Sequence, residues 1–210
     1  MEDRDTVLLV DDDPSFLKTA NNALQEFYAV SVASSGGEAV ELTSSGYVPD
    51  IVLLDITMPN MDGYETLGKL REIEDMQDVP VIFLTSMTTL ESELQGIESG
   101  AIDYIKKPFT RELMLARVRR HLENGRRLRQ LSIIEKDKQA AGIDEEKFRQ
   151  AAADLNETEQ KMLRLLILGY SNKEIAETLH YSYNYVRRII SIIYEKKFVG
   201  TRDELKKLMR

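Results

Sequence analysis

Five short apolar runs constrain the fold of the first 110 residues more than any other feature of the sequence. They are VLLV (7–10), AVSV (29–32), IVLL (51–54), VIFL (81–84) and DYI (103–105). Runs that are apolar at consecutive positions are typical of parallel strands buried on both faces. Helix-like stretches separate them, and the first has Pro14 behind Asp13, a favourable N1 and N-cap pair. We therefore expect an α/β fold, a doubly wound five-stranded parallel sheet covered by helices.

Polar residues follow these runs, and three of them are carboxylates. Asp11 and Asp12 follow the first run, Asp55 the third, Thr85 the fourth and Lys107 the fifth. Ligands of open parallel sheets bind beyond the carboxyl ends of the strands, so functional groups are expected at these positions. Clustered carboxylates repel one another unless they share a cation, and a site with only oxygen ligands favours Mg²⁺.

This set of side chains is suited to phosphoryl transfer. Asp55 is placed to attack as the nucleophile, while a metal ion and Lys107 stabilise charge on the phosphoryl oxygens. Thr85 is placed to donate a hydrogen bond to the same group. Any one of these residues alone is more often a turn former or a helix cap, and the joint placement carries the interpretation.

Composition excludes several other classes of site. The chain has no cysteine and two histidines, so disulfides, thiolate nucleophiles and zinc sites of cysteine or histidine are excluded. The acidic start lacks a basic segment followed by an apolar one, and no run approaches the ~18 apolar residues of a membrane span. We expect a cytoplasmic protein that does not enter a membrane.

The second half of the chain has a different character. Residues 1–120 contain 10 basic and 22 acidic residues, whereas residues 151–210 contain 11 and 8. Three capping boxes occur in the second half, with a fourth helix start at Ser182, which predicts four short helices. The boxes are Asn156 with Glu159, Ser171 with Glu174, and Thr201 with Glu204. The close middle pair is typical of a helix-turn-helix module, so two modules with different partners are expected.

The boundary between the modules depends on the fifth helix of the first one. This helix starts near Thr110 and either ends at Asn124–Gly125 or continues toward Ile134. Residues 135–147 are polar and contain a glycine, which favours a linker. We predict a first domain over residues 1–124, a linker over 125–150 that is helical in its first part, and a second domain over 151–210.

The first domain resembles the receiver domain of two-component response regulators. The motifs that carry the resemblance are VLLVDDDP, DIVLLDITMPNMDGYE, VIFLTS and YIKKPF, in the order and spacing of that family. The resemblance implies a flavodoxin-like fold, with Asp55 as phospho-acceptor and Lys107 as the family's lysine. It further implies a Mg²⁺ site and a switch pair. The metal site would comprise Asp12 and Asp55 as direct ligands, Asp11 in the outer sphere and the Thr57 backbone carbonyl; the switch pair would be Thr85 and Tyr104.

The second domain resembles the LuxR-type helix-turn-helix, most specifically in GYSNKEIAETL. The helix from Tyr183 to about Lys197 would be the recognition helix. DNA contacts would come from Lys173, Tyr185, Arg187 and Arg188, although Arg188 could equally be a solvated charge.

This half departs from its family at the end of the recognition helix and along its face. We expect Phe198 to take the core position of the family's leucine, with Gly200 ending the helix. The helix also has more isoleucine than one buried stripe needs. Ile189 or Ile192 would then be exposed, to contact either a thymine methyl or a protein partner.

Together these features predict a response regulator that a sensor histidine kinase phosphorylates on Asp55 and that regulates transcription. It would be a homodimer when phosphorylated, and it would not be a conventional enzyme because its chemistry acts on itself. The alternative is a receiver whose helical domain binds a protein instead of DNA. A phosphatase with an aspartyl intermediate would need an acid where Thr57 stands.

Overall fold

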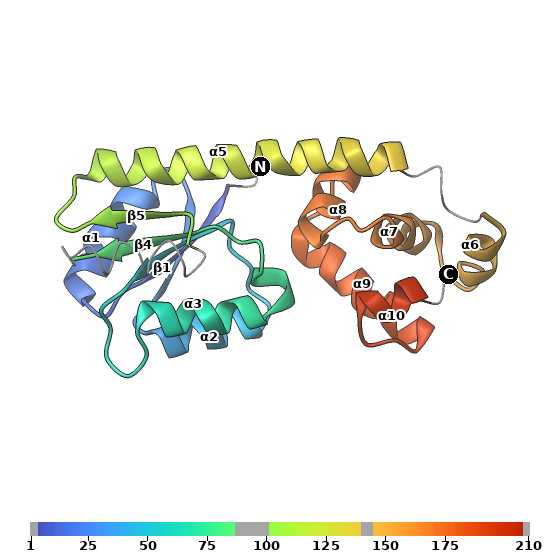
Figure 1. Ribbon diagram of the computed structural model, residues 1–210, viewed down its shortest axis with the longest axis horizontal. Helices are drawn as coiled ribbons and strands as arrows, with labels where there is room; N and C mark the ends of the chain where they lie inside the picture. Colours follow the sequence, from blue (N-terminus) through green and yellow to red (C-terminus); the bar gives the residue numbers. More distant parts are fainter. Residues whose placement is uncertain (1–3, 87–100, 140–144, 208–210) are drawn as a thin grey trace. The chain divides into compact units, whose positions relative to one another are not determined.

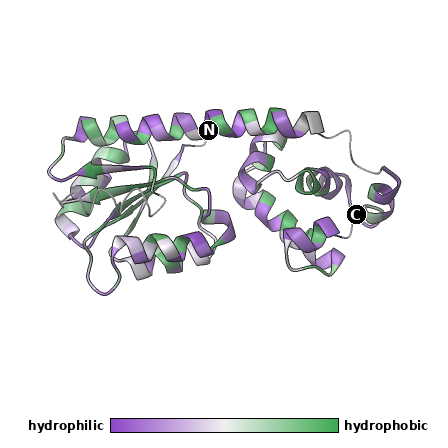
Figure 2. Ribbon diagram, viewed as in Figure 1, coloured by the Kyte–Doolittle hydropathy of each residue, from purple (hydrophilic) through white to green (hydrophobic). Residues whose placement is uncertain are grey.

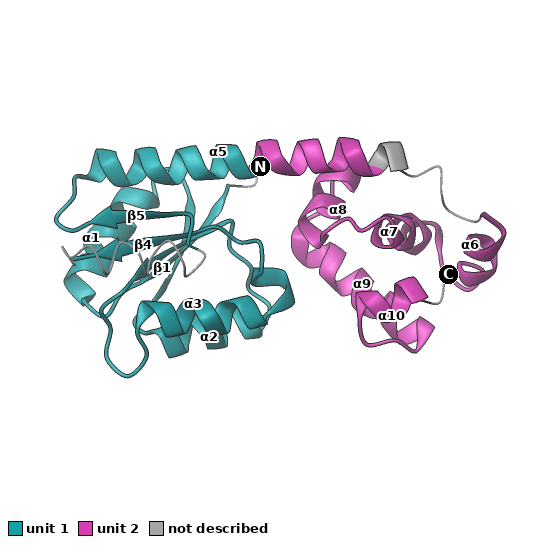
Figure 3. Cartoon of the chain, in the orientation of Figure 1, with its two compact units in different colours: residues 1–125 teal, residues 126–210 magenta. Residues whose placement is uncertain are grey.

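The computed structural model describes residues 4–86, 101–139 and 145–207. The chain forms two compact units, residues 1–125 and 126–210, and each is considered by itself below (Figure 3).

The first unit is a five-stranded sheet with strand order β2-β1-β3-β4-β5, and all its strand pairs are parallel. Figure 1 shows α5 covering one face of the sheet and α2 and α3 the other. The predicted α/β fold is confirmed. The elements are β1 (Thr6–Val10), α1 (Pro14–Leu24), β2 (Ala29–Ala33), α2 (Gly36–Ser44), β3 (Ile51–Asp55), α3 (Gly63–Glu72), the 3-10 helix η1 (Glu74–Met76), β4 (Val81–Thr85), β5 (Asp103–Lys106) and the first part of α5 (Arg111–Gln139).

Both faces of the sheet are buried, which explains the unbroken apolar runs. Along β3, Ile51 and Leu53 belong to the core beneath α1 and α5, while Val52 and Leu54 belong to the core beneath α2 and α3. Every residue of β3 is buried, whereas the edge strand β5 is buried only at Ile105. In Figure 2 the strands are mostly hydrophobic, whereas hydrophobic and hydrophilic residues alternate along the helices.

The fifth helix does not stop at Asn124–Gly125. It continues to Gln139, and its residues from 126 onward belong to the second unit. There Ile133 packs against the core of that unit, and its carbonyl accepts a hydrogen bond from the Tyr170 hydroxyl at 3.2 Å. Phe148 in α6 (Glu145–Ala151) is buried in the same core. Much of the predicted linker is therefore helix that packs on the second unit.

The rest of the second unit is helical, as the capping boxes predicted. The elements are α7 (Glu157–Ile167), α8 (Asn172–Leu179), α9 (Tyr183–Lys197) and α10 (Arg202–Lys207). Complete capping boxes begin α7, at Asn156, and α8, at Ser171. In the third predicted box, at α10, the Glu204 carboxylate accepts a hydrogen bond from the Gly200 amide at 2.7 Å. Within the described part of the chain, none of the helices is long and apolar enough to cross a membrane.

The ends of α7, α8 and α9 all use left-handed backbone, at Gly169, His180 and Phe198 with φ of 84°, 55° and 53°. Glycine adopts this conformation without strain, whereas other residues incur a cost. The expectation that Phe198 enters the core is wrong, because its side chain is 96% exposed. The αL turn at the end of α9 points the ring into solvent, and Val199 packs against the core in its place.

Replacing Phe198 with glycine is expected to stabilise the second unit by about 1 kcal/mol, because it relieves αL strain and removes little buried surface. Urea unfolding followed by circular dichroism measures the change. Gly169→Ala at the matching cap of α7 is the control, and it is expected to destabilise by about 1 kcal/mol. A Phe198→Gly protein less stable than the parent would contradict this account.

Candidate functional site

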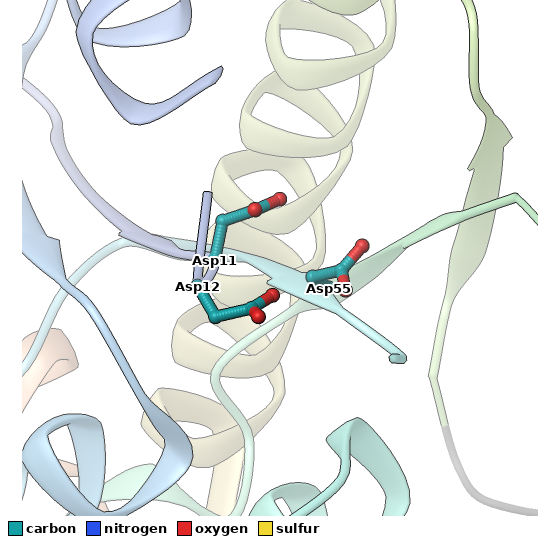
Figure 4. A group of neighbouring side chains, drawn as sticks. All are labelled: Asp11, Asp12 and Asp55. Atoms are coloured by element: carbon teal, nitrogen blue, oxygen red, sulfur yellow. The ribbon is translucent and has the colours of Figure 1, made fainter. Parts of the chain in front are cut away.

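The carboxyl ends of β1 and β3 bring three carboxylates together, as predicted. Asp11 and Asp12 directly follow β1, and Asp55 is the last residue of β3. Figure 4 shows the three side chains gathered at this edge of the sheet, and one oxygen from each lies within 4.8 Å of the others. Asp11 and Asp55 are buried and Asp12 is exposed, so the cluster opens to solvent on one side.

Lys107 joins the two buried carboxylates. Its Nζ donates to Asp11 Oδ2 and to Asp55 Oδ1, each at 2.6 Å, and lies 4.3 Å from the centre of the Phe16 ring. The Lys107 amide donates to the Thr85 carbonyl at 2.6 Å, and the peptide bond to Pro108 is cis. The contact between Lys107 and Phe16 was not predicted from the sequence, in which its only signal is the position of Phe16 in the helix that Pro14 begins.

Backbone contacts fix the orientation of Asp55. The Thr57 amide donates to Asp55 Oδ2 at 2.9 Å, which leaves Oδ1 directed at the Lys107 ammonium. The loop then returns, and the Gly63 amide donates to the Ile56 carbonyl at 2.9 Å. A Cβ on Gly63 would lie 2.5 Å from the Asp55 carbonyl oxygen, so a larger residue would displace this strand end. The Asp55 carboxylate is thus held in one direction by its own loop.

The electrostatics of the site reflect burial and pairing. Burial raises the pKa of Asp55 above its usual value, against the opposing effect of the Lys107 hydrogen bond and charge, and the nearby Asp11 charge raises it further. Burial alone would lower the pKa of Lys107, but its hydrogen bonds to Asp11 and Asp55 outweigh that and raise it. The lysine therefore stays a cation, and the pocket retains excess negative charge that a further cation would stabilise.

The two proposed switch residues lie on the edge strand β5 and on its neighbour β4. Thr85 ends β4 and its side chain is buried at 7% exposure. Tyr104 is in β5, paired with Phe83 of β4, and its side chain is 44% exposed. The structure thus brings Asp11, Asp12, Asp55 and Lys107 into contact range at this edge, and it places Tyr104 on the surface.

In the second unit, the predicted DNA-contact residues lie on α8 and the first half of α9. Tyr185 and Arg188 are exposed, while Lys173 and Arg187 are partly buried. The centre of the Tyr185 ring lies 4.9 Å from that of exposed Tyr181, which is in the turn between α8 and α9 and was not among the residues predicted from the sequence. Ile189 is partly buried against the core rather than exposed, and Ile192 is also partly buried.

The response regulator receiver domain model matches residues 7–119, more than half of the chain. The chain belongs to this family. The receiver assignment covers the first unit, with its five-stranded parallel sheet and its acidic edge.

Known proteins extend this comparison. A probable transcriptional regulator of Porphyra purpurea, ycf29, is 31% identical over 206 residues, covering 96% of this chain and 93% of that protein. A probable cyclic di-GMP phosphodiesterase of Vibrio cholerae is 41% identical over 121 residues, 58% of this chain, and the chain spans only 27% of that relative's length. The receiver domain of sensor histidine kinase PA1611 of Pseudomonas aeruginosa, solved with magnesium coordinated in its active site cleft, is 27% identical with a TM-score of 0.53, over 57% of this chain and 98% of that one.

Receiver domains bind Mg²⁺ at an acidic site, and the aspartate cluster of this receiver fits such an ion. Its donors are all carboxylate oxygens, the type that Mg²⁺ prefers, and exposed Asp12 leaves the cluster open to solvent and ions. Lys107 already neutralises part of the charge, so the ammonium and a bound cation would share the same carboxylates.

With a chelator present to remove metal ions, Lys107→Ala is expected to destabilise the receiver by about 2 kcal/mol, because two buried carboxylates lose their counter-charge. The loss should shrink as pH falls through the raised pKa of Asp55, since a protonated Asp55 no longer needs the ammonium. Added Mg²⁺ should restore more stability to the variant than to the parent. Urea unfolding at several pH values measures all three effects.

Exposed Lys106 is the matched control, and Lys106→Ala is expected to change stability by less than about 0.5 kcal/mol. Equal losses in the two lysine variants would show that the Lys107 contacts contribute nothing.

Proposed function

We propose that the chain is a response regulator that accepts a phosphoryl group on Asp55 from a sensor histidine kinase and regulates transcription through its second unit. The observation that carries the proposal is the contact of the Lys107 ammonium with Asp55 Oδ1, beside Asp11 and Asp12. A buried nucleophile, a fixed cation and an open acidic cluster are what transfer to a carboxylate requires.

The residues of the receiver have separate roles in this transfer. Asp55 Oδ1 forms the new bond to phosphorus while the bond from phosphorus to the donor's imidazole nitrogen breaks, and the imidazole leaves. The Thr57 amide holds Oδ2 so that Oδ1 faces the donor, and Lys107 stabilises the charge on the phosphoryl oxygens. Asp11, Asp12, Asp55 and the Thr57 carbonyl would hold Mg²⁺, which supplies further positive charge to those oxygens.

Phosphorylation would then bias a switch. Thr85 and Tyr104 are proposed as its two members, with the Thr85 hydroxyl donating to the phosphoryl group and Tyr104 leaving its exposed position on β5. One phosphoryl group can favour only the state in which Thr85 and Lys107 reach it, so the change is a population shift. The reaction modifies the protein itself and has no turnover substrate. The proposed readout is a phosphorylated homodimer that binds DNA.

The second unit supports DNA binding by the arrangement of α8 and α9. Three residues, 180–182, connect the two helices, and the Ser182 side chain caps α9, where Asn184 and Tyr185 are exposed in the first turn. This arrangement supports the proposal of a LuxR-type helix-turn-helix, with Lys173, Tyr185, Arg187 and Arg188 as proposed contacts to phosphates or base edges. This chain is similar along most of its length to a probable transcriptional regulator, which also favours DNA binding by the second unit.

A protein partner in place of DNA is the second candidate function. Several cations of this unit lie in ion pairs within it, including Lys136 with Glu174, Lys196 with Glu159 and Lys197 with Asp154. The exposed pair Tyr181 and Tyr185 offers aromatic surface of the kind enriched in protein interfaces.

Asp55→Asn is expected to abolish transfer of labelled phosphate from a phosphorylated kinase or a small acyl-phosphate donor, while the fold is retained. Asp13→Asn is the matched control, because Asp13 caps α1 and asparagine is an equally good cap. The control should keep its label. Label retained by Asp55→Asn would assign the acceptor elsewhere.

Arg187→Ala is expected to weaken binding to DNA fragments selected from a genomic library and to lower the salt slope by about one. Arg149→Ala on α6, an exposed cation away from α8 and α9 in sequence, should leave both unchanged. Affinity measured across a salt series tests this. Failure to enrich any fragment, with or without a phosphoryl mimic, would favour the protein partner.

A further inference from the structure

An exposed face of α5 within the second unit has no role in the proposed chemistry. We call it the 127–135 face, and it comprises Arg127, Leu128, Leu131, Ile134 and Glu135. Leu128 is 67% exposed, Leu131 52% and Ile134 51%, although all three are large aliphatic residues. Three such residues within two helical turns make an apolar patch of the kind that marks an interaction site.

The opposite face of the same segment already packs within the unit. Ile133 packs against the core, Arg129 pairs with Glu177 at 2.8 Å, and Lys136 pairs with Glu174 at 2.6 Å. Figure 3 shows this part of α5 running beside α8. The helix segment is therefore anchored on one side, and the 127–135 face is held outward as a preformed surface.

The order of residues on this face is self-complementary about Leu131. A helix turns by about 100° and rises by about 1.5 Å per residue, so all five residues lie within about 60° of Leu131 around the axis. If two copies cross antiparallel at Leu131, a residue four positions before it meets the residue four positions after it on the partner. Arg127 then faces the partner's Glu135, and the reverse contact repeats the same ion pair.

The apolar residues match in the same way. Three positions before and after Leu131 lie Leu128 and Ile134, so each Leu128 lies at the same height as the partner's Ile134, on the other side of the central contact between the two Leu131 side chains. In a parallel pairing, each Arg127 would instead face the partner's Arg127, and each Glu135 the partner's Glu135. Like charges at matched positions are unfavourable, so the charge pattern selects the antiparallel pairing.

We infer that the 127–135 face binds a second copy of this chain, through an antiparallel, two-fold symmetric pairing of α5 centred on Leu131. Matching a surface to itself in this way is the property that a two-fold interface requires. The inference deepens the proposed homodimer and rests on it, because it assigns the surface through which the copies meet. Five residues a side is far below the ~20 of a standard stable interface, so the pairing is weak by itself.

Because the natural chain has no cysteine, single-cysteine variants can report this pairing directly. Full-length Arg127→Cys and Glu135→Cys proteins are mixed in equal amounts and oxidised, with and without beryllofluoride and Mg²⁺ as a phosphoryl mimic. We expect the mixed 127–135 disulfide to exceed the share that random pairing would produce. Leu131→Cys should cross-link to itself, whereas Leu113→Cys, another exposed leucine of the same helix, should not. Random pairing, or an excess of 127–127 products, would overturn the inference.

A charge-reversal cycle tests the same contact without cysteines. Arg127→Glu and Glu135→Arg should each weaken dimerisation by about threefold to tenfold, and the double reversal should restore it, because the two-fold pairing is then complementary again. Circular dichroism checks that each variant keeps its helix content. Failure of the double variant to recover would count against the pairing.

Sedimentation of the parent chain separates failure of this surface from failure of the proposed homodimer. A dimer that forms with the phosphoryl mimic but gives no 127–135 cross-link would leave the homodimer standing and reject this face. If no dimer forms in either state, both the homodimer and this face are rejected. Phosphoryl acceptance by Asp55 is tested separately by its own variant.

Discussion

The Lys107 ammonium, held between Asp11 and Asp55, is the interaction on which the receiver site depends. Parallel strands deliver their carboxyl ends to one edge, so the fold forces carboxylates together and leaves them to repel one another. A single cation that contacts both buried carboxylates at 2.6 Å offsets that repulsion while exposed Asp12 keeps the cluster accessible. The site is therefore stable before any ligand binds, and it still has charge to offer to a metal ion and a phosphoryl group.

The long α5 helix contributes side chains to the core of each unit. In the receiver its apolar residues Met114, Val118 and Leu122 complete one of the two cores. Beyond Gly125 the same helix contributes Ile133 to the core of the second unit and leaves Leu128 and Leu131 outward. The segment between the modules is thus structured surface, available for contacts of its own.

Much of the site could be predicted because it follows from a rule about the backbone. Residues that come directly after buried parallel strands lie at one edge, and this rule alone predicts that Asp11, Asp55 and Lys107 lie together. The boundary of α5 could not be predicted in this way. Asn124 and Gly125 disfavour helix locally, by roughly 1 kcal/mol for a glycine, but packing of both flanking segments outweighs that cost. The predicted burial of Phe198 was wrong for another reason. A pattern of apolar residues carries no information about the left-handed turn that Phe198 adopts.

By itself, the sequence determined the strand and helix order, the capping of α7 and α8, and the identity of the acidic cluster, because each depends on local spacing or on which residue ends a strand. Only the tertiary structure decided which carboxylate oxygens Lys107 contacts, where α5 ends, and which aliphatic side chains remain outside a core. Those outcomes depend on packing between segments far apart in the chain, where the free energy of burial competes with local preference. No local pattern in the sequence contains that balance.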